Sequence, residues 1–428
     1  MGRLIIEGSN RVKGEVTPSG NKNEALPALA ACLLTDEEVT LTNLPRIRDV
    51  LVMCDVLADL GAEVEWTGEH SARIRARRID KSEMDRVLCG RVRASILFAG
   101  PMVARVGRVD LPPPGGDVIG RRKLDTHFAA LRSLGASLEV GDSYHLRADH
   151  LVGSEMFLDE ASVTGTENAL MAAVLARGTT VIENAACEPH VQGLCRMLQS
   201  MGASIDGIGT NNLTIEGVDR LHGATHRIGS DYLEVGSFMC LGGVMGDGLT
   251  IHDVVPRDLR KILTVFARMG LEARIEGTDC VVPGGQELAI QADMHGVVPQ
   301  IDDAPWPQFP TDLMSIAIVT ATQAAGTVLF FEKMYEGRMF FVDSLISMGA
   351  SIILCDPHRV VVAGPSNLYA STLRSPDIRA GMALLIACLA ASGRSVMHNV
   401  EQIDRGYEHI DDKLKAIGAV IERVEEGD

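Results

Sequence analysis

The chain has 428 residues and a formal net charge of −17, with 46% hydrophobic and only 4% aromatic residues. This length exceeds one ordinary hydrophobic core, so two domains or a repeat array are expected. The negative charge argues against a general role on nucleic acid or acidic membranes. The scarcity of aromatic rings argues against a stacking platform for single-stranded nucleic acid.

Cysteine usage bears on the compartment. Nine cysteines are scattered at irregular spacing without a C-x-x-C pair, which fits reduced thiols better than a disulfide framework. No segment has the composition of a signal peptide or a membrane-spanning helix. We therefore expect a cytoplasmic protein with neither a nucleic acid nor a membrane as partner.

Six segments in chain order are almost wholly apolar, so each predicts a helix buried on every side: 24–34, 92–104, 166–176, 234–245, 311–325 and 378–391. A β-rich run follows each of them, and an amphipathic helix follows the run. This second helix ends in a hydrophobic-Gly-Ala phrase or a close variant, which predicts a left-handed turn at six glycines: Gly61, Gly135, Gly202, Gly270, Gly349 and Gly418. The phrase recurs at a period of roughly 70 residues, the mark of an internal repeat.

The six repeats divide into two α/β domains of three. One is predicted over residues 22–229 and includes a lid loop at 111–125. The other is discontinuous and combines residues 1–21 with 230–428, because the strand-like opening segment 4–18 belongs with the last three repeats. Two linkers between similar domains predict a hinge, and the cleft between the domains is then the default ligand site.

Polar residues recur at two places in the repeat, the start of the buried helix and the loop after the following strand. Helix N-termini carry a partial positive charge, and arginines in the loops would add to it, so we expect an anion site. The alternative is that the helix-start residues Asn23, Asp231, Asp312 and Asp377 are N-caps and the arginines are solvated. The loop arginines are Arg48, Arg122, Arg257, Arg338 and Arg405.

The loop of the second repeat is longer than its equivalents. Pro112 to Pro114 stiffen its entry, and Gly115 with Gly116 permits sharp backbone geometry. A long glycine-containing loop on a rigid scaffold is a lid candidate. It would carry Asp117, Arg121, Arg122 and Lys123; an ordinary surface excursion is the alternative.

Eight segments together resemble the UDP-N-acetylglucosamine 1-carboxyvinyltransferase family of the EPSP synthase superfamily: SGNKNEALPALA, RASILFAGPMVAR, PPGGDVIGRRKLDTHF, SVTGTENALMAA, FPTDLMS, YEGR, DIRAGMALLIA and HNVEQIDRGYEHIDDKL. The resemblance spans essentially the whole chain. It implies two domains, each an inside-out α/β barrel of three βαβαββ units, with a cleft that closes on its substrates. It also implies phosphoenolpyruvate and UDP-N-acetylglucosamine as substrates, with no metal or organic cofactor. A monomer is favoured.

The resemblance also implies roles for residues of this chain. Lys22, Arg122 and Arg405 would hold the phosphate of phosphoenolpyruvate, and Arg338 and Arg379 would lie near its carboxylate. Asn23 would contact both substrates, and Asp312 would lie at the reacting sugar hydroxyl. The remaining contacts to the sugar nucleotide would come from Arg93, Arg122, Leu124, Asp125, Ser162, Val163, Thr311 and Met334.

The implied reaction is an addition followed by an elimination. Asp312 accepts the proton of the sugar 3′-hydroxyl while the oxygen attacks C2 of phosphoenolpyruvate, and a second proton reaches C3. Reversed proton movements then expel phosphate. A carboxylate beside guanidinium groups is expected to stay ionised and available as a base. The catalytic set would be Asp117, Asp312, Lys22 and Arg405.

The lid departs from the family pattern at Asp117, because most members have a cysteine there that the epoxide fosfomycin alkylates. A carboxylate is a poorer trap for an epoxide, so resistance to fosfomycin is predicted. Asp117 is also a candidate proton donor to C3, with a purely structural lid contact as the alternative.

Four further departures concern the acceptor rather than the reaction: Lys123, Cys187, His190 and Gly337. They leave open a paralogous enzyme acting on another nucleotide such as UMP. A non-catalytic sugar-nucleotide-binding homologue is the other alternative, and retention of the whole basic set with Asp312 argues against it.

Overall fold

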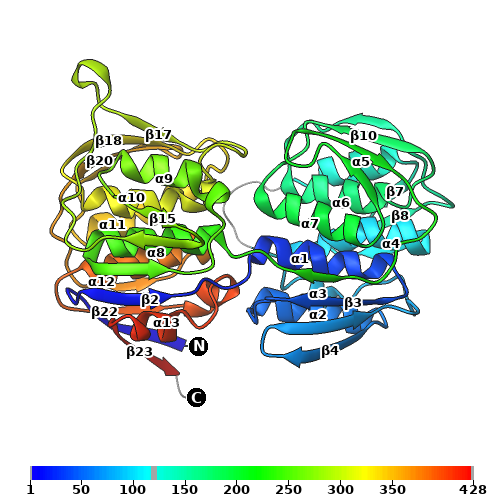
Figure 1. Ribbon diagram of the computed structural model, residues 1–428, viewed down its shortest axis with the longest axis horizontal. Coiled ribbons are helices and arrows are strands. Elements are labelled where there is room, and N and C mark those ends of the chain that lie inside the picture. Colours follow the sequence, from blue (N-terminus) through cyan, green and yellow to red (C-terminus); the bar gives the residue numbers. More distant parts are fainter. Residues whose placement is uncertain (1, 117–122, 426–428) are drawn as a thin grey trace. The chain divides into compact units, whose positions relative to one another are not determined.

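The computed structural model describes residues 2–116 and 123–425, and these residues form two compact units (Figure 1). The unit that we call N-terminal holds residues 20–116 and 123–229. The unit that we call C-terminal holds residues 2–19 and 230–425. The chain therefore passes from one unit to the other after Ser19 and again after Gly229. Asp117, Arg121 and Arg122 of the predicted lid lie outside the described residues.

Three buried helical segments form the core of the N-terminal unit: α1 (Lys22–Ala31), η2 with α4 (Arg93–Phe98 and Ala99–Val106) and α6 (Val163–Ala173). A strand follows each of them: β3 (Glu38–Thr42), β6 (Arg108–Leu111) and β10 (Thr179–Glu183). Then come the amphipathic helices α2 (Arg48–Asp59), α5 (Asp125–Ser133) and α7 (Pro189–Ser200). Each repeat closes with a strand pair: β4 (Glu63–Gly68) with β5 (Ser71–Arg75), β7 (Ser137–Val140) with β8 (Tyr144–Arg147), and β11 (Ser204–Asp206) with β12 (Asn212–Glu216).

The C-terminal unit repeats this order around three other buried helices: α8 (Tyr232–Met245), α10 (Met314–Thr322) and α12 (Ile378–Ala390). The strands after them are β14 (Gly246–Ile251), β18 (Gly326–Phe331) and β22 (Arg394–His398). The amphipathic helices are α9 (Arg260–Ala267), α11 (Val342–Ser347) and α13 (Ile410–Ala416). The closing strands are β15 (Arg274–Glu276) with β16 (Asp279–Val282), β19 (Ile352–Asp356) with β20 (Arg359–Gly364), and β23 (Val420–Glu425) with β1 (Gly2–Glu7).

One sheet topology recurs. In each four-stranded sheet a first strand pairs in parallel with the strand that follows the buried helix, and the two closing strands add antiparallel, as in the order β17-β18-β20-β19. These first strands are β2 (Val12–Val16), β9 (Glu155–Phe157), β13 (Thr225–Arg227), β17 (Gln300–Asp302) and β21 (Thr372–Arg374). In the second repeat the first strand is reduced to one bridge, between Glu83 and Asp110. The predicted α/β class with βαβαββ repeats is therefore confirmed.

Strands from distant parts of the sequence complete both units. Strand β1 lies between β22 and β23 in the last sheet, and β2 pairs in parallel with β14. Strand β13 pairs in parallel with β3, so the first repeat takes its opening strand from the end of the N-terminal unit. In each unit, one sheet therefore contains a first strand that is distant in sequence from the helix and strands of its repeat.

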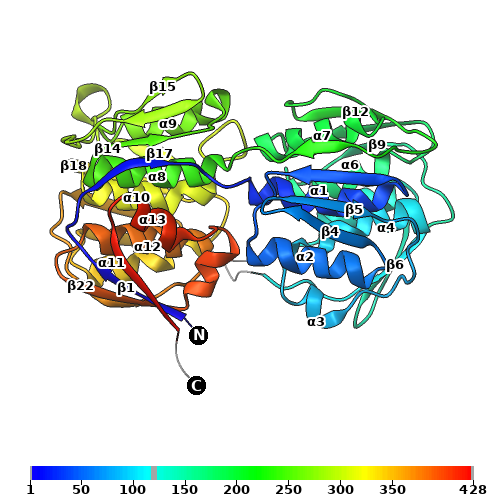
Figure 2. The ribbon, with the colours of Figure 1, turned by 60° about the horizontal axis from the view of Figure 1, so that its bottom comes forward.

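Within each unit the apolar helices are inside and the sheets and amphipathic helices surround them (Figures 1 and 2). All six glycines of the repeated phrase have positive φ, between 80° at Gly270 and 103° at Gly202 and Gly349, as predicted. Only glycine adopts this conformation without steric cost, which allows a sharp turn from helix to strand. Among the described residues, no helix is both long and apolar enough to cross a bilayer.

Candidate functional site

The polar residues at the starts of the buried helices are of two kinds: some cap the helix, and others do not. Asp231 caps α8 by accepting from Leu233 N at 2.9 Å, and Asp377 caps α12 by accepting from Arg379 N at 2.8 Å. The cap of α1 is Asn21, so the capping interpretation is wrong for Asn23. It is also wrong for Asp312, which lies inside the short helix η5 (Thr311–Leu313), whose cap position is Pro310.

Asp312 lies between two guanidinium groups of the C-terminal unit. Its Oδ1 forms an ion pair with Arg338, and its Oδ2 is 3.4 Å from Arg379 Nε. Helix η5 places the carboxylate, η6 (Arg338–Phe341) begins with one arginine, and α12 carries the other in its first turn. Charge-assisted pairs of this kind favour the ionised carboxylate and fix its direction.

Arg379 is held in the interior by several partners. Its side chain is only 5% exposed, and its Nη2 also lies 3.9 Å from Asp231 Oδ2. The guanidinium stacks over the ring of Tyr407 at 5.2 Å, and the hydroxyl of Tyr407 is 2.9 Å from Ser237 Oγ. Burial lowers the pKa of Arg379, but Tyr407, Asp312 and Asp231 together raise it above its ordinary value. The side chain therefore remains a fixed cation.

Arg338 has a similar balance. Its side chain is 10% exposed and lies over the ring of Tyr335 at 5.3 Å. Burial lowers its pKa, while the carboxylates of Asp312 and Glu332 raise it more, so the net shift is upward. Arg338 and Arg379 thus present two permanent positive charges on either side of one carboxylate. Such a pair suits a small anion that carries its own carboxylate.

The other predicted site residues of the C-terminal unit are Thr311, Met334 and Arg405. Thr311 donates its hydroxyl to both oxygens of Glu332, at 3.0 and 2.9 Å. Met334 is partly exposed, and its backbone N–H donates to Glu332 Oε1 at 3.1 Å. Arg405 is buried at the end of η7 (Val400–Arg405), which packs against α12, and it donates to Gln402 Oε1 at 3.0 Å.

In the N-terminal unit, Lys22 and Asn23 open α1. The ammonium of Lys22 is 2.7 Å from Asp49 Oδ2 at the start of α2, and both side chains are almost fully buried. Asn23 is half-buried and not engaged as a cap. The ion pair fixes the position of the Lys22 ammonium at the N-terminal end of a buried helix, where anions are favoured.

Arg93 lies at the base of the predicted lid. It begins η2 and donates to the backbone oxygen of Lys123 at 3.4 Å. A Cβ added to Gly115 would lie 1.9 Å from the carbonyl oxygen of Gly90, and Gly116 has a φ of +117°. The two glycines are therefore required, one for close approach and the other for its backbone angle.

Two helix N-termini of the N-terminal unit lie side by side. Leu124 occupies the cap position of α5, and Asp125 is its first residue. Ser162 caps α6 by accepting from Gly165 N at 3.2 Å, and Val163 follows. A Cβ on Gly165 would lie 3.0 Å from a methyl of Thr126, which places the two helix starts in contact. Adjacent N-termini present free N–H groups suited to phosphate oxygens.

The loop arginines differ in their surroundings. The side chain of Arg338 and the whole of Arg405 are nearly buried, whereas Arg48 and Arg257 are exposed, as the solvated alternative predicted for them. Of the four departures, Lys123 is exposed, Cys187 is half-buried and His190 is buried in the first turn of α7. Gly337 directly precedes Arg338 and is half-buried.

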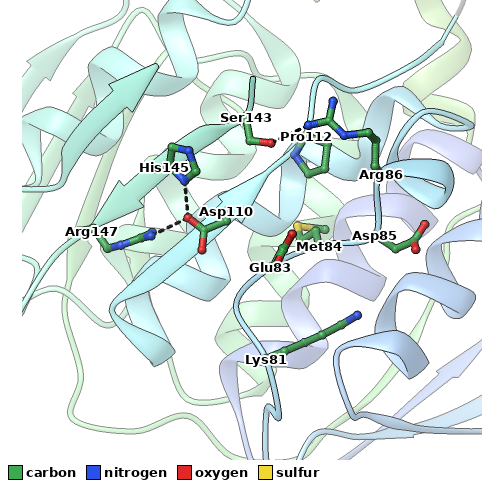
Figure 3. Close-up of a pocket in the computed structure, with 10 residues that line it drawn as sticks. All are labelled: Lys81, Glu83, Met84, Asp85, Arg86, Asp110, Pro112, Ser143, His145 and Arg147. Atoms are coloured by element: carbon green, nitrogen blue, oxygen red, sulfur yellow. Dashed lines mark hydrogen bonds and ion pairs between the residues drawn. The ribbon is translucent and has the colours of Figure 1, made fainter. Parts of the chain in front are cut away.

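A polar pocket of the N-terminal unit is lined by none of these predicted site residues, although Pro112 of the predicted lid segment contributes to it (Figure 3). Some of its charged groups have partners within the pocket. Asp110 Oδ1 is 2.5 Å from both His145 Nδ1 and Arg147 Nη2, and Arg86 donates to Ser143 Oγ at 3.1 Å. We assign it no role. Nowhere in residues 2–116 and 123–425 do three or more His, Cys, Asp or Glu side chains gather as metal ligands would.

Three residues that contact the predicted site residues were not predicted from the sequence. Asp49, the ion-pair partner of Lys22, directly follows Arg48 in the PRIRD segment, and only the arginine was considered there. Glu332 follows the apolar strand TVLFF directly, and a charge at the end of a buried strand was the available signal. Tyr407 gave none, since an aromatic residue beside Gly406 is common in loops.

Comparisons with known proteins show the family to which the chain belongs. The profile of the EPSP synthase (3-phosphoshikimate 1-carboxyvinyltransferase) family matches residues 6–414. The UDP-N-acetylglucosamine 1-carboxyvinyltransferase of Treponema denticola is 54% identical over 422 residues, covering 99% of both chains. The enzyme of the same name from Borreliella burgdorferi is 55% identical over 425 residues, again covering 99% of both chains.

Solved structures share the fold. The enolpyruvyl transferase NikO from Streptomyces tendae aligns with a TM-score of 0.89 at 23% identity, over 99% of each chain. The EPSP synthase of Acinetobacter baumannii aligns with a TM-score of 0.76 at 18% identity, over 99% of this chain and 100% of its own. The two-unit architecture, the repeats and the full-length identity to curated relatives place the chain in the EPSP synthase family, among its UDP-N-acetylglucosamine 1-carboxyvinyltransferases.

Proposed function

We propose that the protein transfers the enolpyruvyl group of phosphoenolpyruvate to the 3′-hydroxyl of UDP-N-acetylglucosamine and releases phosphate. This is the first committed step of peptidoglycan synthesis. The observation that carries the proposal is the carboxylate of Asp312 between Arg338 and Arg379. It combines a base for the sugar proton with two fixed cations for the carboxylate of phosphoenolpyruvate.

The reaction balances with groups of this chain and its substrates. Asp312 takes the proton of the 3′-hydroxyl as its oxygen bonds to C2 of phosphoenolpyruvate, and C3 receives a proton to give a tetrahedral ketal. Loss of a proton from C3 and cleavage of the C2–O bond to phosphate then give the enol ether. Lys22, Arg122 and Arg405 would stabilise the phosphate, and Asp117 is the proposed donor to C3.

The N-terminal unit would supply most of the sugar-nucleotide contacts. The adjacent starts of α5 and α6, at Leu124, Asp125, Ser162 and Val163, suit the uridine diphosphate. Asn23, Arg93, Thr311 and Met334 complete the proposed set. Addition and elimination need proton transfer and charge stabilisation alone, so we propose no metal or organic cofactor. We place the reaction in the cytoplasm, with the protein as a monomer.

The test is release of inorganic phosphate from phosphoenolpyruvate in the presence of a single acceptor. UDP-N-acetylglucosamine, UMP and shikimate 3-phosphate are supplied in separate reactions. We expect turnover with UDP-N-acetylglucosamine and at least ~100-fold lower kcat/KM with the other two, since their missing or altered groups leave polar partners unpaired. Preference for UMP would identify a paralogue, and no turnover with any acceptor would overturn the proposal.

Asp117 leads to a prediction about inhibition. Incubation with fosfomycin is expected to leave the mass of the protein unchanged and its activity intact, because a carboxylate opens the epoxide far less readily than a thiolate does. The Asp117→Cys variant is the control and should gain one adduct. A covalent adduct on Asp117 in the unaltered protein would contradict the prediction.

A further inference from the structure

Two buried carboxyl groups lie next to the cluster around Asp312. Strands β17 and β18 are parallel neighbours, with Asp302 opposite Phe331 in register. The residues that follow, Asp303 and Glu332, therefore leave the same edge of the sheet together. Both are 0% exposed. Two carboxyl groups without solvent need hydrogen-bond donors or a proton, since paired anions in an apolar site repel strongly.

The donors available to the pair leave one oxygen unsatisfied. Glu332 Oε1 accepts from Met334 N at 3.1 Å and Tyr335 N at 3.0 Å, and Thr311 Oγ1 reaches both Glu332 oxygens. Asp303 Oδ1 accepts from Lys333 N at 2.6 Å. Asp303 Oδ2 is buried and has no hydrogen-bond donor. A proton on the neighbouring Glu332 carboxyl group would supply one. A hydrogen bond between two carboxyl groups requires a proton on one of them.

The charges around the pair also favour retention of that proton. Burial, and then the carboxyl of Asp303, raise the pKa of Glu332 to about 8, although Arg338 opposes the shift. Lys333 is partly exposed and pairs with Asp302 instead. His358 Nδ1 donates to the backbone oxygen of Glu332 at 2.7 Å rather than to its carboxyl group.

The bonds of Glu332 link the two segments that carry the reacting cluster. Through Thr311 it holds η5, which bears Asp312, and through the N–H groups at 334 and 335 it holds the turn that leads to Arg338. We propose that Glu332 and Asp303 share one proton and form a positioning pair, which fixes the Asp312 carboxylate against the Arg338 guanidinium. The inference rests on the proposed function.

The sign of the pH effect follows from the shared proton. In the unfolded chain the two carboxyl groups lose their protons at ordinary acidic values, whereas the folded pair keeps one. Above the unfolded pKa the folded state binds more protons, so its stability falls as pH rises toward the folded pKa. Above that pKa the pair becomes a buried dianion, and the segments bearing Asp312 and Arg338 are expected to separate.

Glu332→Gln tests the proton directly. The amide Nε2 donates permanently to Asp303 Oδ2, and its oxygen can still accept from the N–H groups at 334 and 335. We expect kcat within about threefold of the unaltered protein near pH 7 and an alkaline limb moved up by at least about one pH unit. Asp303→Asn should give the same shift. Glu332→Ala should lower kcat at least about tenfold at every pH, because nothing then links the two segments.

Further measurements separate this inference from the proposed function. Urea midpoints at about pH 6, 7.5 and 9 require no substrate; the unaltered protein should lose stability over this range relative to Glu332→Gln. Glu287→Gln, an exposed carboxyl in the same unit, is the matched control and should change neither measurement. Superimposable pH profiles for Glu332→Gln and the unaltered protein, in both activity and stability, would overturn the inference. Failure of turnover with every acceptor would count against the proposed function alone.

Discussion

Asp312→Asn is expected to lower kcat for phosphate release by roughly 10³-fold while the Kd for UDP-N-acetylglucosamine changes by less than about threefold. The amide keeps the shape of the carboxylate, but it cannot accept the sugar proton as a carboxylate does. Because Asp312 is ion-paired with Arg338 and lies 3.4 Å from Arg379, the carboxylate is already directed before substrate binds. Its loss should therefore affect the chemical step more than ground-state binding.

Steady-state phosphate release and calorimetric titration with UDP-N-acetylglucosamine measure the two effects. Asp343→Asn is the matched control, since Asp343 is an exposed carboxylate at the start of α11 in the same unit. The control should retain full activity. A kcat within about fivefold of the unaltered protein in Asp312→Asn would remove Asp312 as the base, because a general base contributes at least about 10²-fold.

Arg379→Met should affect both folding and turnover. Removal of the guanidinium leaves Asp231 buried and without its cation, which is expected to cost about 3–5 kcal/mol of unfolding free energy. It also removes one of the two cations proposed for the carboxylate of phosphoenolpyruvate. We expect the KM for phosphoenolpyruvate to rise at least about 100-fold, with little change in the Kd for the sugar nucleotide.

The stability loss in Arg379→Met should depend on pH. Burial raises the pKa of Asp231, and Arg379 opposes that shift. Without Arg379 the pKa of Asp231 rises further, and protonation then removes the cost of burying its negative charge. The deficit is therefore expected to be larger near pH 8 than near pH 5, as measured by urea unfolding. Arg394→Met, which removes a 59% exposed arginine paired with Glu7, should show neither effect. A deficit that is constant with pH would contradict this account of Arg379.

Local patterns carried most of the fold prediction. Apolar runs, turn glycines and β-rich runs are properties of neighbouring residues. Their recurrence at a period of roughly 70 residues can therefore be recognised without a structure. The exchange of strands was only half visible. The opening segment was expected among the last three repeats, but the pairing of residues 225–227 with β3 was not, because three residues give too little pattern to assign a partner.

The candidate site divides in the same way. The sequence indicated that Asp312 and Arg379 lie at the starts of buried helices and that Arg338 lies in the loop after a strand, the two recurring polar positions of the repeat. It could not distinguish Asp231 and Asp377, which cap their helices, from Asp312, which does not, because capping depends on one backbone angle and one hydrogen bond. Nor could it distinguish the buried Arg405 from the exposed Arg257.

By itself, the sequence determined the repeat, the α/β class and the residue types available for an anion, because helix and strand periodicity and motif spacing are written along the chain. Tertiary structure alone decided which charges meet. The register of β17 against β18 brings Asp303 to Glu332, and the start of α2 brings Asp49 to Lys22. Both are encounters between segments separated in sequence, where the free energy of a buried charge depends on its neighbours rather than on its position in the chain.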